Sequence, residues 1–168
     1  MISERLEKAL NEQISKELHS EYYYLVMAVW FTSKNLDGFT NFFKVQVQEE
    51  RFHALKMFDY LLDRGGKVYL ETIKKSPQDF ELAEDIFKKA YEHEQFVTMS
   101  INELMNLATE KKDHASQKFF DWYVQEQLEE ETSMDNILTK IRLVYEKRHG
   151  LLLLDEKLSQ RTFTVPAQ

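Results

Sequence analysis

Glutamates recur at positions where a helical protein would place its hydrophobic core. When the helical segments are read in steps of three and four residues, each gives a mainly apolar strip that carries an acid. The clearest strip has six apolar residues and one carboxylate: Phe87, Ala90, Glu94, Val97, Ile101, Leu104 and Ala108. The acids on the other three strips are Glu17, Glu50 and Glu130. Four separate segments are therefore expected to direct carboxylates toward one polar layer.

A layer of this kind requires positive charge. An unpaired buried carboxylate costs several kcal/mol, so four of them would offset the whole stability of a domain, ~5–15 kcal/mol. No Lys or Arg lies on the four strips, whereas two divalent cations would balance the four formal charges. The alternative is that each acid is a solvated surface residue wrongly assigned to a strip. That alternative needs the same coincidence on four helices.

The spacing of the polar residues indicates a site for two metal ions. Glu50 and His53 are three residues apart on one helical face, where a carboxylate and an imidazole can reach the same ion. Glu17 precedes Glu50 by 33 residues, and Glu94 precedes Gln127 by 33. A shift of 77 positions aligns five identical residues, the Phe-Phe and Val-Gln-Glu of 42–49 with those of 119–126. A duplicated helical hairpin would build such a site with pseudo-twofold symmetry.

The residue types favour iron. The chain has no cysteine, which excludes iron–sulfur clusters, thiolate zinc sites and thiol nucleophiles. A set of carboxylates with a single imidazole suits iron or manganese better than a structural zinc or a calcium site. Iron is the preferred expectation.

The elements that position these residues are predicted to be long helices. Only four Gly and two Pro occur in 168 residues, too few turn formers for a many-stranded sheet. We expect one all-α domain over 1–168, with helices over 3–34, 38–64, 78–111 and 114–148 and a short one over about 152–160. Ser3, Asp37 and Ser76 are the predicted caps of the first three helices, although the third could begin as late as Leu82.

The lengths of the connections predict the topology. Tight joints after the first and third helices make antiparallel hairpins, and the longer link from Gly66 to about Ser76 can run the length of a bundle. A four-helix bundle has no interior room for the apolar fifth helix, which we expect at a subunit contact.

Charge and hydropathy limit the partners. A net charge of −7 opposes binding to nucleic acid. The longest apolar runs, such as 25–31, fall far short of the roughly 20 residues that cross a bilayer. Charged residues crowd the first dozen positions, where a signal peptide would be apolar. No membrane association is predicted, and a cytoplasmic location is expected.

Over essentially its whole length the chain resembles the ferritin family, specifically the haem-free prokaryotic ferritins. The resemblance rests on Glu17 with Tyr24, and on three motifs: Glu-Glu-Arg-Phe-His at 49–53, Tyr-Glu-His-Glu-Gln at 91–95 and Trp-Tyr-Val-Gln-Glu-Gln-Leu-Glu-Glu-Glu at 122–131. It implies a ferritin-like four-helix bundle of two antiparallel hairpins joined by a long crossover, plus a short C-terminal helix.

The resemblance also implies roles for individual residues. Glu17, Glu50 and His53 would hold the first iron, and Glu50 would bridge to a second iron held by Glu94 and Glu130. Gln127 occupies a polar position at or beside the second site. Tyr24 resembles the tyrosine that hydrogen-bonds a ligand or supplies an electron, although it could be an ordinary core tyrosine. The residues that resemble a third iron site are Glu49, Glu126 and Glu129 with Glu130; taken singly, the first three could be solvated helix-face acids.

The implied activity is that of a ferroxidase that stores iron. Fe(II) would be oxidised by oxygen or peroxide and kept as hydrous ferric oxide inside a homo-oligomeric shell, which in this family has 24 subunits. Haem is not expected, because Arg51 stands where haem-binding relatives carry a ligating Met. Two alternatives remain: a di-iron oxidase that acts on a small organic substrate, and a structural bundle without metal.

Overall fold

The computed structural model describes residues 1–144 and 149–165, and of Arg148 the backbone alone. The described part of the chain contains five helices and no strand. The helices are α1 (Glu4–Ser33), α2 (Asp37–Asp63), α3 (Ala83–Glu110), α4 (His114–Val144) and α5 (Arg148–Leu158). The all-α prediction is confirmed. Residues 145–147, assigned from the sequence to the fourth helix, lie outside the described residues, and Arg148 belongs to α5.

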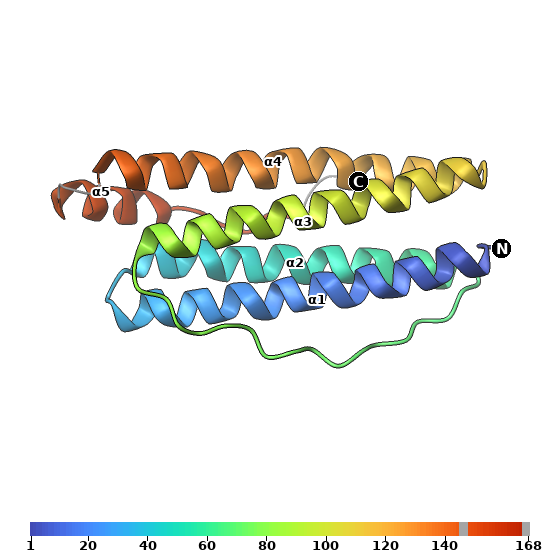
Figure 1. Cartoon of the computed structure of the whole chain (residues 1–168), viewed down its shortest axis with the longest axis horizontal. Helices are drawn as coiled ribbons and strands as arrows, with labels where there is room; N and C mark the ends of the chain where they lie inside the picture. The colour runs from blue at the N-terminus through green and yellow to red at the C-terminus, as the bar shows by residue number, and fades with distance from the viewer. Residues whose placement is uncertain (145–147, 166–168) are drawn as a thin grey trace.

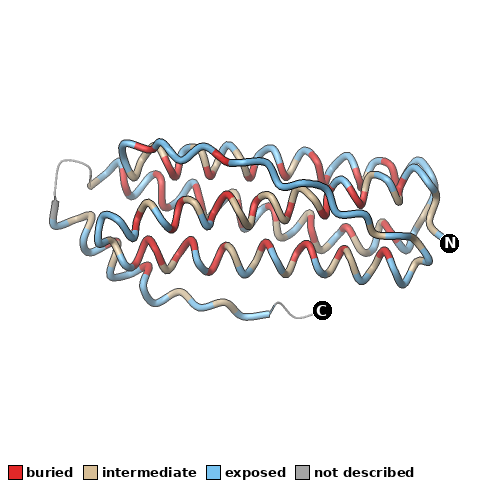
Figure 2. Tube along the Cα trace, turned by 90° about the horizontal axis from the view of Figure 1, so that it is seen from below, coloured by how far each residue is buried: buried red, intermediate tan, exposed pale blue. Residues whose placement is uncertain are grey.

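The four long helices form two antiparallel hairpins, α1 with α2 and α3 with α4 (Figure 1). The chain then runs from the end of α2 back along α1 as an extended crossover before α3 begins (Figure 1). This arrangement brings one face of each long helix to a shared interior, which Figure 2 shows as buried positions that recur along the helices.

The third helix begins at Ala83, later than the predicted start at residue 78. Ser76 does not cap it: this side chain is buried, and its Oγ lies 3.4 Å from Nε2 of His19 on α1. Phe80 packs into the core, and its carbonyl oxygen accepts a hydrogen bond from Trp30 Nε1 at 2.9 Å. These contacts keep the last part of the crossover extended against α1, which explains the later start.

The start of α2 also differs from the prediction, because Asp37 is the first helical residue and not the cap. The backbone N–H of Phe39 instead donates to Oδ1 of Asp155 on α5, at 2.9 Å. A side chain on a residue at position 38 would place its Cβ 1.6 Å from the carbonyl oxygen of Asp155. Gly38 is therefore required by the close approach of α5 to α2. Ser3 caps α1 as predicted.

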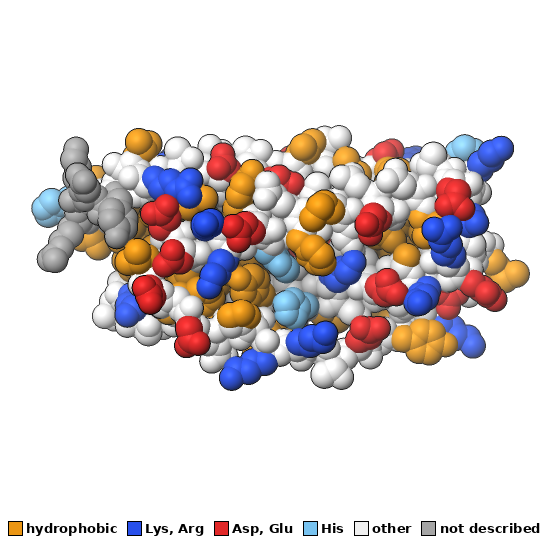
Figure 3. Space-filling model, in the orientation of Figure 1, with side chains coloured by type: hydrophobic (Ala, Val, Ile, Leu, Met, Phe, Trp, Pro, Cys, Tyr) orange, Lys and Arg blue, Asp and Glu red, His pale blue; other side chains and the backbone are white. Residues whose placement is uncertain are grey.

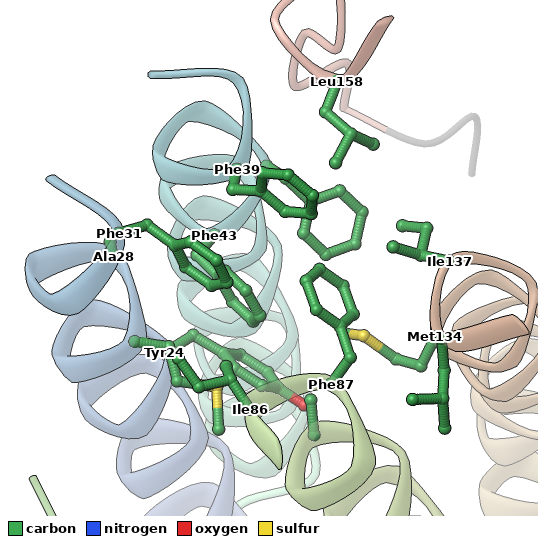
Figure 4. Close-up of a cluster of buried hydrophobic side chains, with 14 of the residues drawn as sticks. Tyr24, Ala28, Phe31, Phe39, Phe43, Ile86, Phe87, Met134, Ile137 and Leu158 are labelled. Carbon is green, nitrogen blue, oxygen red and sulfur yellow. The ribbon is translucent and has the colours of Figure 1, made fainter. Parts of the chain in front are cut away.

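An aromatic cluster closes the end of the bundle nearest α5 (Figure 4). The Phe31 and Phe39 rings stack with centroids 4.9 Å apart, and Phe87 from α3 lies 5.0 Å from Phe43. Leu154 and Leu158 on α5 are buried in the same cluster. The fifth helix therefore packs one face on the bundle of its own subunit, which the sequence-based expectation of a subunit contact had not included.

The outer surface carries mixed charge. On the face drawn in Figure 3, acidic and basic side chains are interspersed with scattered apolar ones. Among the described residues, none of the helices combines the length and hydrophobicity needed to cross a bilayer.

Candidate metal centre

The bundle brings the strip acids together in one buried layer. Glu17 from α1, Glu50 from α2, Glu94 from α3 and Glu130 from α4 are each at most 4% exposed. His53 and Gln127 are buried beside them. The six residues come from all four long helices, so the layer exists only when both hairpins are packed together.

One group of potential ligands, all three of them buried, consists of Glu17, Glu50 and His53. The Nδ1 atom of His53 lies 3.6 Å from Oε2 of Glu50 and 3.9 Å from Oε2 of Glu17. One potential ligand atom from each residue lies within 4.8 Å of the other two. Carboxylate oxygens and one imidazole nitrogen at this spacing could hold a single iron ion.

Glu94 is held from two sides. The hydroxyl of Tyr24 donates a hydrogen bond to its Oε1, and Nε2 of Gln127 donates to its Oε2 at 3.1 Å. The Tyr24 side chain is fully buried, and burial is the main cause that raises its pKa well above 10.0. The phenol is therefore neutral at physiological pH and remains a hydrogen-bond donor.

Two buried amides orient the acids, and the sequence analysis assigned neither of them a role. Gln13 donates from Nε2 to Oε1 of Glu17 at 2.7 Å, and its own Oε1 accepts from Ser100 at 2.6 Å. Gln46 donates from Nε2 to Oε2 of Glu130 at 2.8 Å. Gln13 precedes its partner Glu17 by four residues, a spacing that could have identified it. Gln46 bonds an acid on another helix, which no local spacing indicates.

The electrostatics of the metal-free layer favour protonated carboxyls. Burial, followed by repulsion from Glu130, raises the pKa of Glu94 from 4.5 to about 8. Burial and then the neighbouring Glu49 raise the pKa of Glu130 to about 7. The pKa of Glu50 is raised well above its ordinary value, mainly by burial and then by Glu94 and Glu17. Bound cations would remove this repulsion and displace the protons.

Unsatisfied polar atoms also point to a ligand in the layer. Within the described residues, His53 Nε2 and Gln46 Oε1 are buried without a hydrogen-bond partner. Buried polar groups are normally paired, so these two atoms call for a partner. For His53 that partner is not the ion beside Glu17 and Glu50, because Nδ1 is the nitrogen that faces those two acids. The donors fit the iron that the sequence predicts, since hard oxygen ligands and a neutral imidazole both bind it.

The residues expected to form a third site lie in different environments. Glu126 is half-buried and forms a second group of potential ligands with His53 and Glu130, within 4.8 Å of one another. Glu129 is exposed. The Oε2 atom of Glu49 lies 2.6 Å from Nη2 of Arg161, a residue that the sequence analysis did not consider.

The fold and this layer define a class of protein: four-helix bundles whose interior carboxylates can bind a pair of metal ions. The family model of the ferritin-like domain matches residues 7–144. The chain therefore belongs to the ferritin family.

Individual relatives agree with this assignment. A bacterial non-heme ferritin of Campylobacter jejuni is 41% identical over 156 residues, which make up 93% of each chain. One from Bacteroides fragilis is 37% identical and is matched over 100% of its length and 96% of this chain. An engineered closed form of the Archaeoglobus fulgidus ferritin has a TM-score of 0.95 at 46% identity, covering 98% of this chain and 100% of its own.

Proposed function

We propose that this protein takes up Fe(II), oxidises it at the buried layer, and stores the resulting Fe(III) as hydrous ferric oxide. The observation that carries the proposal is the convergence of four buried glutamates and His53 inside a ferritin-family bundle. The named relatives are bacterial non-heme ferritins. Organic substrates are a weaker alternative, because the acids are at most 4% exposed.

In this proposal, Glu17, Glu50 and His53 hold one iron, while Glu94 and Glu130 hold the second. Glu50 connects the two positions, and Gln127 lies beside the second one. Hard carboxylate ligands stabilise Fe(III) more than Fe(II), so binding favours loss of one electron from each ion. The two electrons, one from each iron, reduce oxygen to hydrogen peroxide or hydrogen peroxide to water. The protons for either reduction are available from the carboxyl groups, which lose them when iron binds.

Storage requires an enclosed space that one bundle cannot provide. We propose that copies of the chain assemble into a hollow homo-oligomer, with 24 subunits as the family expectation. The exposed apolar face of α5, which carries Leu152 and Leu153, supports a contact between copies there. The two side chains are 58% and 67% exposed, although the opposite face of the helix is buried.

Aerobic loading tests the proposal. Fe(II) is added to the metal-free protein while particle mass and ultraviolet absorbance are followed together. We expect a shell-sized particle that takes up many irons per subunit, with much slower oxidation in Glu94→Gln. A matched control is Glu103→Gln, which neutralises an exposed acid on the same helix. Binding that stops at a few irons on a small oligomer would contradict storage.

A further inference from the structure

The chain after α5 folds back onto α2. This C-terminal arm, residues 159–165, runs along the outside of the bundle on the side away from the crossover (Figure 2). Asn41 on α2 fixes its start, because Nδ2 donates to the carbonyl oxygens of Leu158 at 3.1 Å, Ser159 at 3.3 Å and Arg161 at 2.9 Å. The arm is therefore attached at a defined register.

In this position of the arm, Arg161 lies beside Glu49, one of the acids expected to form a third iron site. Its Nη2 donates to Oε2 of Glu49 at 2.6 Å, and its guanidinium carbon lies 4.3 Å from the centre of the Phe42 ring. Two residues further on, the Phe163 ring lies 6.3 Å from Phe52, the neighbour of the candidate ligand His53. The arm thus brings a permanent positive charge to a residue expected to bind iron.

We propose that Arg161 is an internal counter-ion for Glu49 that iron must displace before the outer carboxylates can bind it. The inference rests on the proposed function and on the sequence-based expectation that Glu49, Glu126 and Glu129, here called the outer carboxylates, form a third iron site with Glu130. A guanidinium always carries its charge and cannot ligate a metal. While it holds Glu49, it occupies one potential ligand and repels a cation from the others.

The contact is suited to reversible release. Among the described residues, the Nη1 atom of Arg161 is buried and has no hydrogen-bond partner, so the docked guanidinium is incompletely satisfied. Thr162, Thr164 and Val165 are exposed, and little of the arm beyond Phe163 is fixed by packing. Displacement of the arm would uncover Glu49 without disturbing the four-helix core. The inner centre would consequently fill before the outer cluster.

The test is a zinc titration of the metal-free, full-length protein, followed by calorimetry, which requires no oxidation. Arg161→Gln removes the charge, and Asn41→Ala releases the arm without changing any charge. A nearby charge shifts the proton affinity of a carboxylate about tenfold or more. We expect both variants to strengthen the weaker class of zinc sites at least about tenfold. Lys157→Gln, a matched charge removal at an exposed position on α5, should have no such effect.

The Arg161→Gln substitution made in a Glu49→Gln variant shows whether the change in zinc affinity arises from the pair of Arg161 and Glu49. In Glu49→Gln, the further change Arg161→Gln should strengthen zinc binding less than it does in the parent protein, because the ion pair is already broken and only the repulsion that keeps a cation from Glu126 and Glu129 is removed. The inference would be overturned if Arg161→Gln left the weaker class of zinc sites unchanged or made its affinity lower. It would also be overturned if Lys157→Gln raised that affinity as much as Arg161→Gln does. The tighter class of zinc sites is a separate readout: its absence from every variant would count against the inner metal centre and the proposed function, not against the role of Arg161.

Discussion

The hydroxyl of Tyr24 on α1 donates a hydrogen bond to Oε1 of Glu94 on α3. Glu94 also accepts from Gln127 on α4, so one carboxyl group joins three helices across the layer. The two hydrogen bonds fix the direction of the Glu94 side chain and lower its pKa, although burial and Glu130 still raise that pKa to about 8. Tyr24 is thus connected to the candidate second iron position through a single side chain.

Replacing Tyr24 with Phe removes this donor and keeps the aromatic packing. We expect Fe(II) oxidation to slow by about tenfold or more, in the range of a lost positioning or proton-transfer contact. Zinc stoichiometry should stay unchanged because no ligand is lost. Stopped-flow absorbance measures the oxidation rate, with the half-buried Tyr22→Phe as the control. Equal rates in the two variants would show that Tyr24 is only a core tyrosine.

Glu94→Leu distinguishes a bundle whose buried acids bind metal from a structural bundle without metal. The substitution leaves the Tyr24 hydroxyl and Gln127 Nε2 without their acceptor, so the metal-free protein should lose about 1–3 kcal/mol of stability. Added zinc should then stabilise the variant much less than the parent protein, since binding to the folded state is what raises stability. Denaturant unfolding with and without zinc provides both values, and Glu103→Leu is the exposed control. Equal stabilisation by zinc would remove Glu94 from the site.

The stability of the metal-free protein should fall as pH rises. The pKa of Glu94 is about 8 in the folded protein and 4.5 ordinarily, so between these values the folded state binds more protons than the unfolded state. The free energy of unfolding therefore decreases from about pH 4.5 to about pH 8, by ~1.4 kcal/mol for each unit of pKa difference.

Denaturant titrations between pH 5 and pH 8 measure this dependence. Glu94→Gln should flatten it, and saturating zinc should reverse it, because cations bind the deprotonated acids. A metal-free protein that becomes more stable over this range would contradict the raised pKa values.

Gly38→Ala should separate α5 from α2. The added Cβ would lie 1.6 Å from the carbonyl oxygen of Asp155, so α5 must shift and weaken the hydrogen bond between Phe39 and Asp155. We expect a loss of about 1–3 kcal/mol, typical of overpacking. Lys44→Ala, at an exposed position on α2, should change stability by less than about 0.5 kcal/mol. Thermal unfolding compares the two, and equal midpoints would refute the close contact.

The helical period made the inner layer predictable. Glu94 interrupts a strip that is otherwise apolar. The core-facing strips of the other three helices, read with the same steps of three and four residues, identified Glu17, Glu50 and Glu130. Burial of all four follows from that phase alone, because a long amphipathic helix has only one face to pack.

Contacts between distant segments were not predictable in the same way. Arg161 lies beyond the last helix, where no periodicity indicates direction, and its position is set by tertiary contacts with Asn41, Glu49 and Phe42. Ser76 lies in a sequence typical of a helix cap, but in the structure its side chain contacts His19 on α1 and does not cap α3. Local preferences were overridden where the chain had tertiary contacts to make.

The central claim is that iron joins the four buried acids. Crystals of the metal-free protein soaked with Fe(II) without oxygen, and measured at the iron absorption edge, test it directly. We expect two anomalous peaks per subunit among Glu17, Glu50, His53, Glu94 and Glu130. A layer without peaks, its acids still bonded to Tyr24, Gln13 and Gln46, would contradict this expectation.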